Sequence, residues 1–297
     1  MAKKPFYTDQ RWITLISFFV LFAVVSVIMF VTGPKDQTED VSLNSQTQLA
    51  VRFIDVGEGD CSVVKTPEGK AVMIDTGLRE YRTQMLTSLE SMGINSLEAL
   101  ILTHSHDDHI GSAASLFDAL DISELVLPNV ADYSAYKDVI EAAQAKGAKI
   151  TRAASPKRMV LDGAVFDFLY DGSDSEDFGS NSSIVIRLTF GKVSFLFTGD
   201  MEEPQERALL EEMTDLRSQV LKIGHHGSET SSCEDFLEEV SPEYAVISVG
   251  RDNSYGHPDL AVLERLENEC KKIFRTDKNS DVTAVTDGES VKILTKK

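Results

Sequence analysis

The chain has 297 residues, of which 29 are Lys or Arg and 48 are Asp or Glu, so its formal net charge at pH 7 is −19. Residues 1–40 carry four basic and four acidic side chains, and the whole acidic excess therefore belongs to residues 41–297. Such a chain lacks the broad basic surface that holds nucleic acid through phosphate charge. Any polyanion has to be held locally, by metal ions and a few basic side chains. The 3 cysteines are widely spaced, which argues against a disulfide framework or a zinc knuckle.

An uncharged, strongly apolar run extends over residues 12–32. It is long enough for a helix that spans a bilayer, which needs about 20 residues. Three basic residues precede the run, so the positive-inside rule predicts that residues 1–11 are cytoplasmic and that the rest of the chain is extracellular. A cleaved signal peptide is the alternative. No A-x-A-like site follows the run, however, and we favour an uncleaved single-pass anchor in the cell membrane. Residues 33–48 are polar without periodicity, which predicts a flexible linker.

The remainder, residues 49–297, is expected to form one domain. Antiparallel strands open it and strand–helix alternation follows, an order that two sheets with helices outside them would satisfy. Strands are expected over 49–56, 61–66, 71–75, 99–103, 124–127, 165–170, 183–190, 193–198, 219–223, 244–249, 272–275, 281–286 and 290–294. Helices are expected over 81–92, 110–120, 135–146, 202–213, 233–239 and 259–269.

All 6 histidines fall in three short clusters, and the densest is an HxHxDH pattern after an apolar strand run. Alternate residues of an extended segment point the same way, so His104 and His106 can share one metal ion. Asp108 and His109 turn onto the following helix and can serve a second ion. Imidazole and carboxylate are natural ligands of a Zn²⁺ or Mn²⁺ hydrolytic centre. A polar helix start with an acidic cap is the competing interpretation, and it does not explain three histidines in six residues.

Three further segments also follow predicted strands. Residues 193–200 end in Thr-Gly-Asp, where Asp200 can bridge two metals through its two oxygens, although Gly-Asp after a strand is usually only a turn. In residues 222–228, either His225 or His226 can ligate while the other donates a proton or a hydrogen bond. In residues 248–258, His257 is either a ligand or an ordinary loop residue, and Arg251 either contacts a phosphate or is merely solvated.

Seven segments in order carry a further signal: DVGEGD (55–60), IDTG (74–77), THSHDDHIG (103–111), NSSIVIRL (181–188), FTGD (197–200), KIGHHGS (222–228) and SVGRDNSYGHP (248–258). Together they resemble the metallo-β-lactamase superfamily, and within it the hydrolase domains of ComEC-type competence proteins. The resemblance covers residues 51–297 and implies an α/β fold, an αββα sandwich with a dinuclear centre at one edge. Ser112 and Ser280 stand where glycine is usual. The superfamily commonly has another ligand histidine before the bridging Asp, and this chain has none from 110 to 224.

By this resemblance, His104 and His106 match one metal site, Asp108 and His109 match the other, and Asp200 bridges them. We assign His226 to the first site and His257 to the second, which leaves His225 as a general acid or oxyanion donor. The roles of the two neighbouring histidines can also be exchanged. The expected site is therefore catalytic Asp108 and His225; metal ligands His104, His106, Asp108, His109, Asp200, His226 and His257; and substrate-binding Ser182, Asn253, Tyr255 and Arg251.

The resemblance also implies a mechanism in which two divalent ions, Zn²⁺ or Mn²⁺, lower the pKa of a bridging water, and the hydroxide attacks phosphorus or a carbonyl. We expect a membrane-anchored extracellular phosphodiesterase, a nuclease that acts on DNA. One alternative is a hydrolase of cell-wall or phosphorylcholine-bearing phosphoesters; a β-lactam hydrolase is disfavoured because the motifs indicate another branch. A different class is a non-catalytic metal-binding surface module. The expected partners are the bilayer, through the N-terminal helix, and extracellular DNA or a phosphoester polymer; no protein partner is indicated.

Overall fold

The structure is a computed structural model, and it describes residues 48–155, 157–173, 180–212 and 215–296. No helix within these ranges is long and apolar enough to cross a membrane. The anchor predicted over residues 12–32, the segment 1–11 before it and nearly all of the predicted linker lie outside the described residues.

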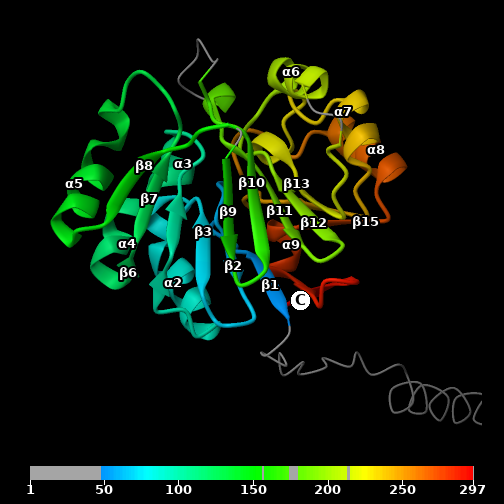
Figure 1. Cartoon of the computed structure of the whole chain (residues 1–297). Helices are drawn as coiled ribbons and strands as arrows, with labels where there is room; N and C mark the ends of the chain where they lie inside the picture. The colour runs from blue at the N-terminus through cyan, green and yellow to red at the C-terminus, as the bar shows by residue number, and fades with distance from the viewer. Residues whose placement is uncertain (1–47, 156, 174–179, 213–214, 297) are drawn as a thin grey trace, which may run out of the picture. The chain divides into compact units, whose positions relative to one another are not determined.

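Two β-sheets form the centre of the domain, and each has an antiparallel half and a parallel half (Figure 1). In the order given next, the antiparallel half of the first sheet comes first and its parallel half last. In the second sheet the parallel half comes first and the antiparallel half last. In spatial order, the described strands of the first sheet are β17 (Val291–Thr295), β16 (Val282–Thr286), β1 (Leu49–Phe53), β2 (Ser62–Lys65), β3 (Ala71–Ile74), β5 (Ala99–Ile101), β7 (Glu124–Leu127) and β8 (Lys149–Arg152). Those of the second are β15 (Lys272–Arg275), β14 (Tyr244–Ile247), β13 (Val220–Lys222), β12 (Val193–Phe197), β11 (Val185–Phe190), β10 (Ala164–Tyr170) and β9 (Lys157–Leu161).

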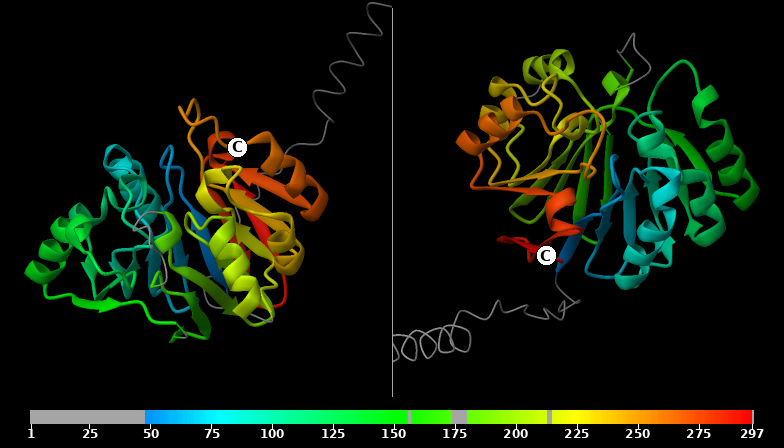
Figure 2. Two further views of the ribbon diagram at one scale, coloured as in Figure 1. Left: turned by 90° about the horizontal axis from the view of Figure 1, so that it is seen from above. Right: turned by 180° about the vertical axis from the view of Figure 1, so that it is seen from behind.

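Helices cover the outer face of each sheet, as Figures 1 and 2 show. The first sheet is covered by α2 (Arg82–Ser91), α4 (Ala113–Ala119) and α5 (Lys137–Lys146). The second is covered by α6 (Glu203–Glu212), α7 (Glu234–Val240) and α8 (Leu260–Glu269). The shorter elements are η1 (Arg79–Tyr81), β4 (Ser96–Leu97), α3 (Asp107–Ile110), β6 (Asp121–Ile122), η2 (Ser134–Tyr136), η3 (Ser180–Ser182), η4 (Gly224–Gly227) and α9 (Thr276–Asn279).

Three apolar clusters hold these four layers together, because alternate residues of a strand face opposite sides of its sheet. In β12, Phe195 and Phe197 point into the core between the sheets, whereas Leu196 points to the core under α6, α7 and α8. In β1, Phe53 joins the core between the sheets and Ala50 joins the core under α2, α4 and α5. The layer order is therefore αββα, and this part of the predicted fold is confirmed.

The predicted elements match the structure closely, and the strands that the sequence missed lie at sheet edges. β7 and β15 have the predicted bounds, and the helix expected over residues 110–120 is divided into α3 and α4. β8 and β9 are the terminal strands of their sheets among the described residues. Each carries two charged side chains, in the sequences KITR and KRMVL, and buries none of its residues fully. Charged edge strands suit the need to discourage pairing with other chains, but they weaken the hydrophobic signal of a strand.

The parallel halves of the two sheets place several strand ends at one edge of the sandwich. β3 and β5 are parallel neighbours in the first sheet, as are β12, β13 and β14 in the second. Ligands in open α/β sheets bind beyond the carboxyl ends of such strands. The segments that follow these five strands carry Asp75, the HxHxDH motif, Asp200, His225 with His226, and His257.

Candidate metal centre

The HxHxDH motif is held in place by the loop of residues 55–60. The backbone N–H of Asp60 donates to the carbonyl oxygen of Asp108 at 3.1 Å. Gly59, the residue before Asp60, has φ +129°, and a Cβ on it would lie 2.2 Å from the carbonyl oxygen of Asp108. Only glycine permits this close approach of two backbones. The DVGEGD segment therefore positions Asp108 through its main chain.

Asp200 lies between two groups of side chains and presents one carboxylate oxygen to each. Its Oδ1 atom is 3.2 Å from the Nε2 atom of His109 and 3.6 Å from that of His226. Its Oδ2 atom is 3.5 Å from the Nε2 atom of His104. Ligand atoms within 4.8 Å of one another accordingly form two groups that share Asp200: the first is Asp108, His109, Asp200 and His226, and the second is His104, His106 and Asp200.

The donor atoms of these groups fit divalent metal ions. The Nε2 atoms of His104 and His109 and the Oδ1 atom of Asp200 are buried and have no hydrogen-bond partner among the residues that the structure describes. Buried polar atoms are rarely left unpaired, because each loses its hydration on burial. All three point toward the centre of the cluster, where a cation would satisfy them. Imidazole nitrogens with carboxylate oxygens suit Zn²⁺ and Mn²⁺.

Asp75 and Ser183 orient the ligands from outside the cluster. The Oδ2 atom of Asp75 lies 2.8 Å from the Nδ1 atom of His109, and Asp75 also accepts hydrogen bonds from the backbone N–H and the hydroxyl of Thr103. Ser183 accepts a hydrogen bond from the backbone N–H of Asp200 at 2.9 Å, and its hydroxyl lies 3.3 Å from the Nδ1 atom of His104. Such partners fix which ring nitrogen of a histidine faces a metal.

A buried ion pair supports His226. The ammonium of Lys222 lies 2.8 Å from the Oδ1 atom of Asp60, and the two side chains are only 1% and 6% exposed. The Nδ1 atom of His226 is 3.0 Å from the carbonyl oxygen of Ser248 and 3.5 Å from Asp60. Its Nε2 atom is thereby directed at the cluster, where it lies 3.0 Å from the Oδ2 atom of Asp108.

The electrostatics of the cluster favour its occupation by cations. Although burial opposes its charge, Asp200 and Asp108 raise the pKa of His226 to about 9. Against the same opposition, Asp200 and Asp75 hold the pKa of His109 well above its ordinary value. Burial disfavours the charged carboxylate of Asp200 too, but His109 and His226 keep its pKa well below the usual range. Without metal, protons on two histidines thus balance the carboxylates, and a metal ion would displace those protons.

The two adjacent histidines of η4 point in different directions. His225 and His226 both have positive φ values, 47° and 55°, a strained conformation for residues with a Cβ that often marks functional sites. His226 is 3% exposed, whereas His225 is 25% exposed. The Nδ1 atom of His225 lies 3.2 Å from Glu202, and its Nε2 atom lies 3.9 Å from the Oδ2 atom of Asp200. His225 therefore stands at the rim of the cluster, on its solvent side.

The structure groups His226 and His257 differently from the sequence expectation. His226 lies with Asp108 and His109, not with His104 and His106. Among the described residues, neither group that shares Asp200 includes His257. The Nδ1 atom of His257 instead lies 3.4 Å from Glu58, and its ring is 6.5 Å from the ring of His226. The loop that carries His257 is tied to the DVGEGD segment through Glu58 and Gly250. In this position the imidazole of His257 lies outside both groups of ligand atoms that share Asp200.

Three of the four expected substrate-binding residues share the loop of residues 250–258, and Ser182 lies in another segment. Ser182 is fully buried, and the contacts with the cluster come from its neighbour Ser183. The amide of Asn253 is used within its own loop, because it donates to the carbonyl oxygens of Gly250 and His257 and accepts from two backbone N–H groups. Arg251 is exposed and donates to the carbonyl oxygen of Asp277. Tyr255 is 73% exposed, and its ring stacks on His257.

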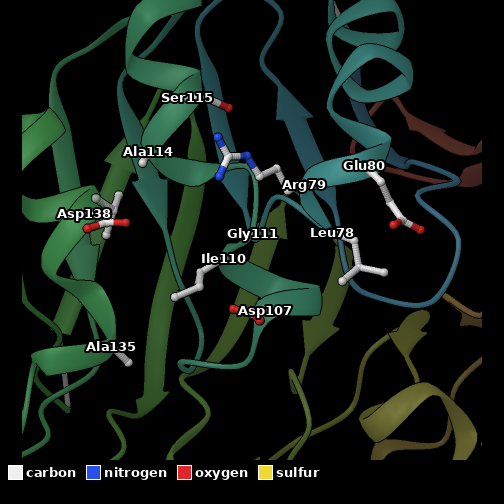
Figure 3. Close-up of a pocket in the computed structure, with 11 residues that line it drawn as sticks. Leu78, Arg79, Glu80, Asp107, Ile110, Gly111, Ala114, Ser115, Ala135 and Asp138 are labelled. Carbon is white, nitrogen blue, oxygen red and sulfur yellow. The ribbon is translucent and has the colours of Figure 1, made fainter.

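Two hollows adjoin the loops that carry the cluster, and acidic side chains dominate both. The first, of about 440 Å³, is drawn in Figure 3, where the Arg79 guanidinium points toward Ala114 and Ser115. Its lining includes three acids, Glu80, Asp107 and Asp138. The second, of about 430 Å³, is lined by Arg251 and by five acids, Asp55, Glu58, Glu80, Asp252 and Asp277. Neither hollow offers a basic surface to a polyanion.

Five residues around the cluster have contacts that were not predicted from the sequence: Asp60, Asp75, Lys222, Ser183 and Glu58. Asp60 and Asp75 both stand in segments that were noted, DVGEGD and IDTG, and Asp75 directly follows the buried strand β3. A carboxylate at the end of a buried strand beside a histidine motif is a detectable signal for an orienting residue. The other three also stand in noted motifs, DVGEGD, NSSIVIRL and KIGHHGS, but their partners lie in other segments of the chain, which no local pattern indicates.

Comparisons with known proteins show the family of the chain. Residues 54–251 match the family described as the metallo-beta-lactamase superfamily. The chain is 32% identical over 251 residues to ComE operon protein 3 of Bacillus subtilis, which covers 78% of the chain and 32% of that protein. It is 34% identical over 234 residues to competence protein ComA of Neisseria gonorrhoeae, which covers 78% of the chain and 31% of that protein. The chain thus spans about a third of the length of these relatives.

A solved structure supports the fold. The metallo-beta-lactamase fold protein YhfI from Bacillus subtilis superposes with a TM-score of 0.55 at 12% identity, over 81% of this chain and 100% of that one. At this identity the likeness concerns the fold alone.

Proposed function

Since the chain belongs to the metallo-β-lactamase superfamily, we propose that it is a membrane-anchored phosphodiesterase with two divalent metal ions that acts on DNA outside the cell. The observation that carries this proposal is Asp200, whose two oxygens each face a separate group of ligand atoms. The choice of DNA is supported by the names of relatives, which refer to competence and to recombination, both of them processes of DNA.

Each of the two groups of residues would hold one metal ion. Asp108, His109, His226 and one oxygen of Asp200 supply the more complete set, and His104, His106 and the other oxygen of Asp200 supply the second. When bound, two divalent ions lower the pKa of a shared water and so provide a hydroxide nucleophile near neutral pH.

The surrounding side chains orient the ligands and move a proton. Asp75 holds the ring of His109 with its Nε2 atom toward the cluster. His225 stands at the solvent side with Glu202 behind its Nδ1 atom at 3.2 Å. A carboxylate in this position fixes the tautomer of an imidazole. We assign His225 the transfer of a proton to the leaving oxygen, a step that general acids accelerate about 10²- to 10⁴-fold.

The anchor belongs to the same proposal. Residues 12–32 would span the bilayer, residues 33–48 would act as a tether, and the hydrolase domain of residues 49–297 would lie on the extracellular side. A polymer substrate would then be cut at the membrane surface, where the tether sets the distance that the domain can reach.

Turnover by the full chain in detergent tests the proposal. A chromogenic phosphodiester and linear single-stranded DNA are offered with Mn²⁺ or Zn²⁺, and Asp108→Ala is compared with Asp107→Ala, which alters the exposed neighbour outside the ligand groups. We expect cleavage of both substrates by the wild type and by Asp107→Ala, and its loss in Asp108→Ala. Cleavage of the small diester alone would indicate a cell-wall or other phosphoester. Bound metal without turnover would indicate a non-catalytic module.

A further inference from the structure

Tyr255 is an aromatic residue that is held at the surface beside the metal centre. Its side chain is 73% exposed. Single exposed apolar residues are common on protein surfaces and need no explanation by themselves. Tyr255 differs because its ring lies 5.7 Å from that of His257 at an interplanar angle of 18°. One face of the tyrosine is thus supported by the histidine, while most of the ring remains open to solvent.

The stacked rings form a row that leads from the metal centre to the surface. The ring of His257 is itself 6.5 Å from the ring of His226, at an angle of 29°. His226 contacts Asp108 within the ligand group. Tyr255 is therefore two ring spacings away from a metal-facing histidine, and it is the outermost ring of the row. A flat group that stacks on the open face of Tyr255 would extend this row outward by one more ring.

The loop that carries Tyr255 is ordered before any ligand binds. Asn253 accepts hydrogen bonds from the backbone N–H groups of Gly256 and His257 and donates to the carbonyl oxygens of Gly250 and His257. Glu58 accepts from the backbone N–H of Gly250 at 2.7 Å, which ties the loop to the DVGEGD segment. A platform held in this way loses little conformational entropy when a ligand stacks on it.

The charge around the site determines which ligand such a platform suits. Both hollows beside the cluster carry more acidic than basic side chains. Phosphate contacts, which normally dominate binding to nucleic acids, can therefore contribute little here. Stacking of a nucleobase on an aromatic ring does not depend on positive charge and tolerates any base. Bases are available for such stacking in a single strand, whereas in a duplex they are already stacked and paired.

We propose that Tyr255 is a stacking platform for a nucleobase of the strand that is bound at the metal centre, and that the site is specific for single-stranded polynucleotides. This inference rests on the proposed phosphodiesterase function and adds the form of its substrate. Tyr255 acts here as a specificity-determining residue that binds one base, while the chemistry stays with the metal centre.

Abasic substrates test this role in the full chain with Mn²⁺. Each single-stranded oligonucleotide of a set carries one abasic residue, at a different position in each member. The cleaved bonds are mapped. KM is then measured for the wild type, Tyr255→Ala and Tyr255→Phe. Val160→Ala, which removes another exposed apolar side chain in β9, is the control. We expect loss of the base at one fixed distance from the cleaved bond to raise KM of the wild type about 5- to 100-fold. Tyr255→Ala should raise KM for the intact strand similarly and remove the difference between intact and abasic strands. Tyr255→Phe and Val160→Ala should behave as the wild type.

The outcomes separate this inference from the function on which it rests. Cleavage that is equally fast with and without the base overturns the stacking role and leaves the nuclease in place. A loss in Tyr255→Ala that is equal for intact and abasic strands also overturns it, because the ring then contacts something other than a base. Duplex cleaved as readily as single strand overturns the specificity. The absence of cleavage of any oligonucleotide overturns both proposals.

Discussion

The Oδ2 atom of Asp75 lies 2.8 Å from the Nδ1 atom of His109, and both side chains are buried. This contact assigns the two nitrogens of the ring, since Nδ1 is used by Asp75 and Nε2 remains for the cluster. Asp75 follows β3 and His109 lies in α3 after β5, and these two parallel strands are neighbours. The pairing of the strands thus brings an orienting carboxylate to a histidine that is 34 residues away in the chain.

Replacement of Asp75 by Asn should weaken metal binding without removing a ligand. The amide has nearly the same shape, but it lacks the charge that favours the orientation of His109. Loss of such an outer partner costs about 10- to 100-fold in metal affinity or activity. Titration calorimetry with Mn²⁺ on the full chain measures this loss. Asp167→Asn, at a surface ion pair with Arg158 in β10 and β9, is the control. Equal affinities of Asp75→Asn and the wild type would remove the orienting role.

Two glycines with positive φ allow the DVGEGD loop to be tested by a matched pair. A Cβ at Gly69, φ +91°, would meet nothing within 4 Å, whereas one at Gly59, φ +129°, would meet the carbonyl oxygen of Asp108 at 2.2 Å. Gly69→Ala should therefore cost only backbone strain, about 1–3 kcal/mol. Gly59→Ala should cost more and should also weaken Mn²⁺ binding, because the loop that carries Asp108 must move. Urea unfolding and metal titration of both variants check this. A Gly69→Ala variant as damaged as Gly59→Ala would contradict it.

The buried pair of Asp60 and Lys222 should be costly to break from one side. Lys222→Met leaves the carboxylate of Asp60 buried without its cation, and such a change typically costs about 3–5 kcal/mol. The double variant Asp60→Asn with Lys222→Met removes both charges and should recover part of the stability. Urea unfolding of the metal-free chain measures both. If the single and double variants have the same free energy of unfolding, Lys222 does not compensate the buried charge of Asp60.

The stability of the metal-free chain should fall as the pH rises above neutrality. The pKa of His226 is raised from 6.5 to about 9, so its charged form is stabilised by folding. That contribution is complete below pH 6.5 and is lost as the pH rises through 9. We expect the Tm of the metal-free chain to fall over this window, and to fall less in His226→Gln. With saturating Mn²⁺ the fall should disappear, because the metal replaces the proton. Calorimetry at pH 6.5 and 9 decides this, and a rise in Tm of the metal-free chain would contradict it.

Local sequence patterns predicted most of the fold, because buried strands and amphipathic helices leave periodic signals. The strand over residues 193–198 was predicted from its apolar residues and is present as β12, with Phe195 and Leu196 facing different cores. β8 and β9 were missed because edge strands carry charges in place of a continuous apolar pattern. The membership in the metallo-β-lactamase superfamily, predicted from ordered motifs, is confirmed.

The structure brings together six of the seven predicted metal ligands, but in other groups than the sequence indicated, and their role as ligands stays a prediction. The residues that follow β5 of the first sheet and β12 and β13 of the second meet at one edge of the sandwich, a position that was predicted only from the resemblance to the family. The position of His226 depends on the turn of η4 and on Lys222 and Asp60 behind it, contacts between distant segments. The outward position of His257 depends on Glu58, which lies about two hundred residues away in the chain. Such contacts exist only in the folded molecule and have no local signature.

Cleavage of single-stranded DNA as a function of Mn²⁺ equivalents, measured with the metal-depleted full chain, tests the account most directly. The bridging position of Asp200 predicts no cleavage without metal, full rate after two ions per chain, and loss of both the second ion and the activity in Asp200→Asn. Cleavage in the presence of a chelator, or two bound ions with no hydrolysis of any phosphodiester, would contradict it.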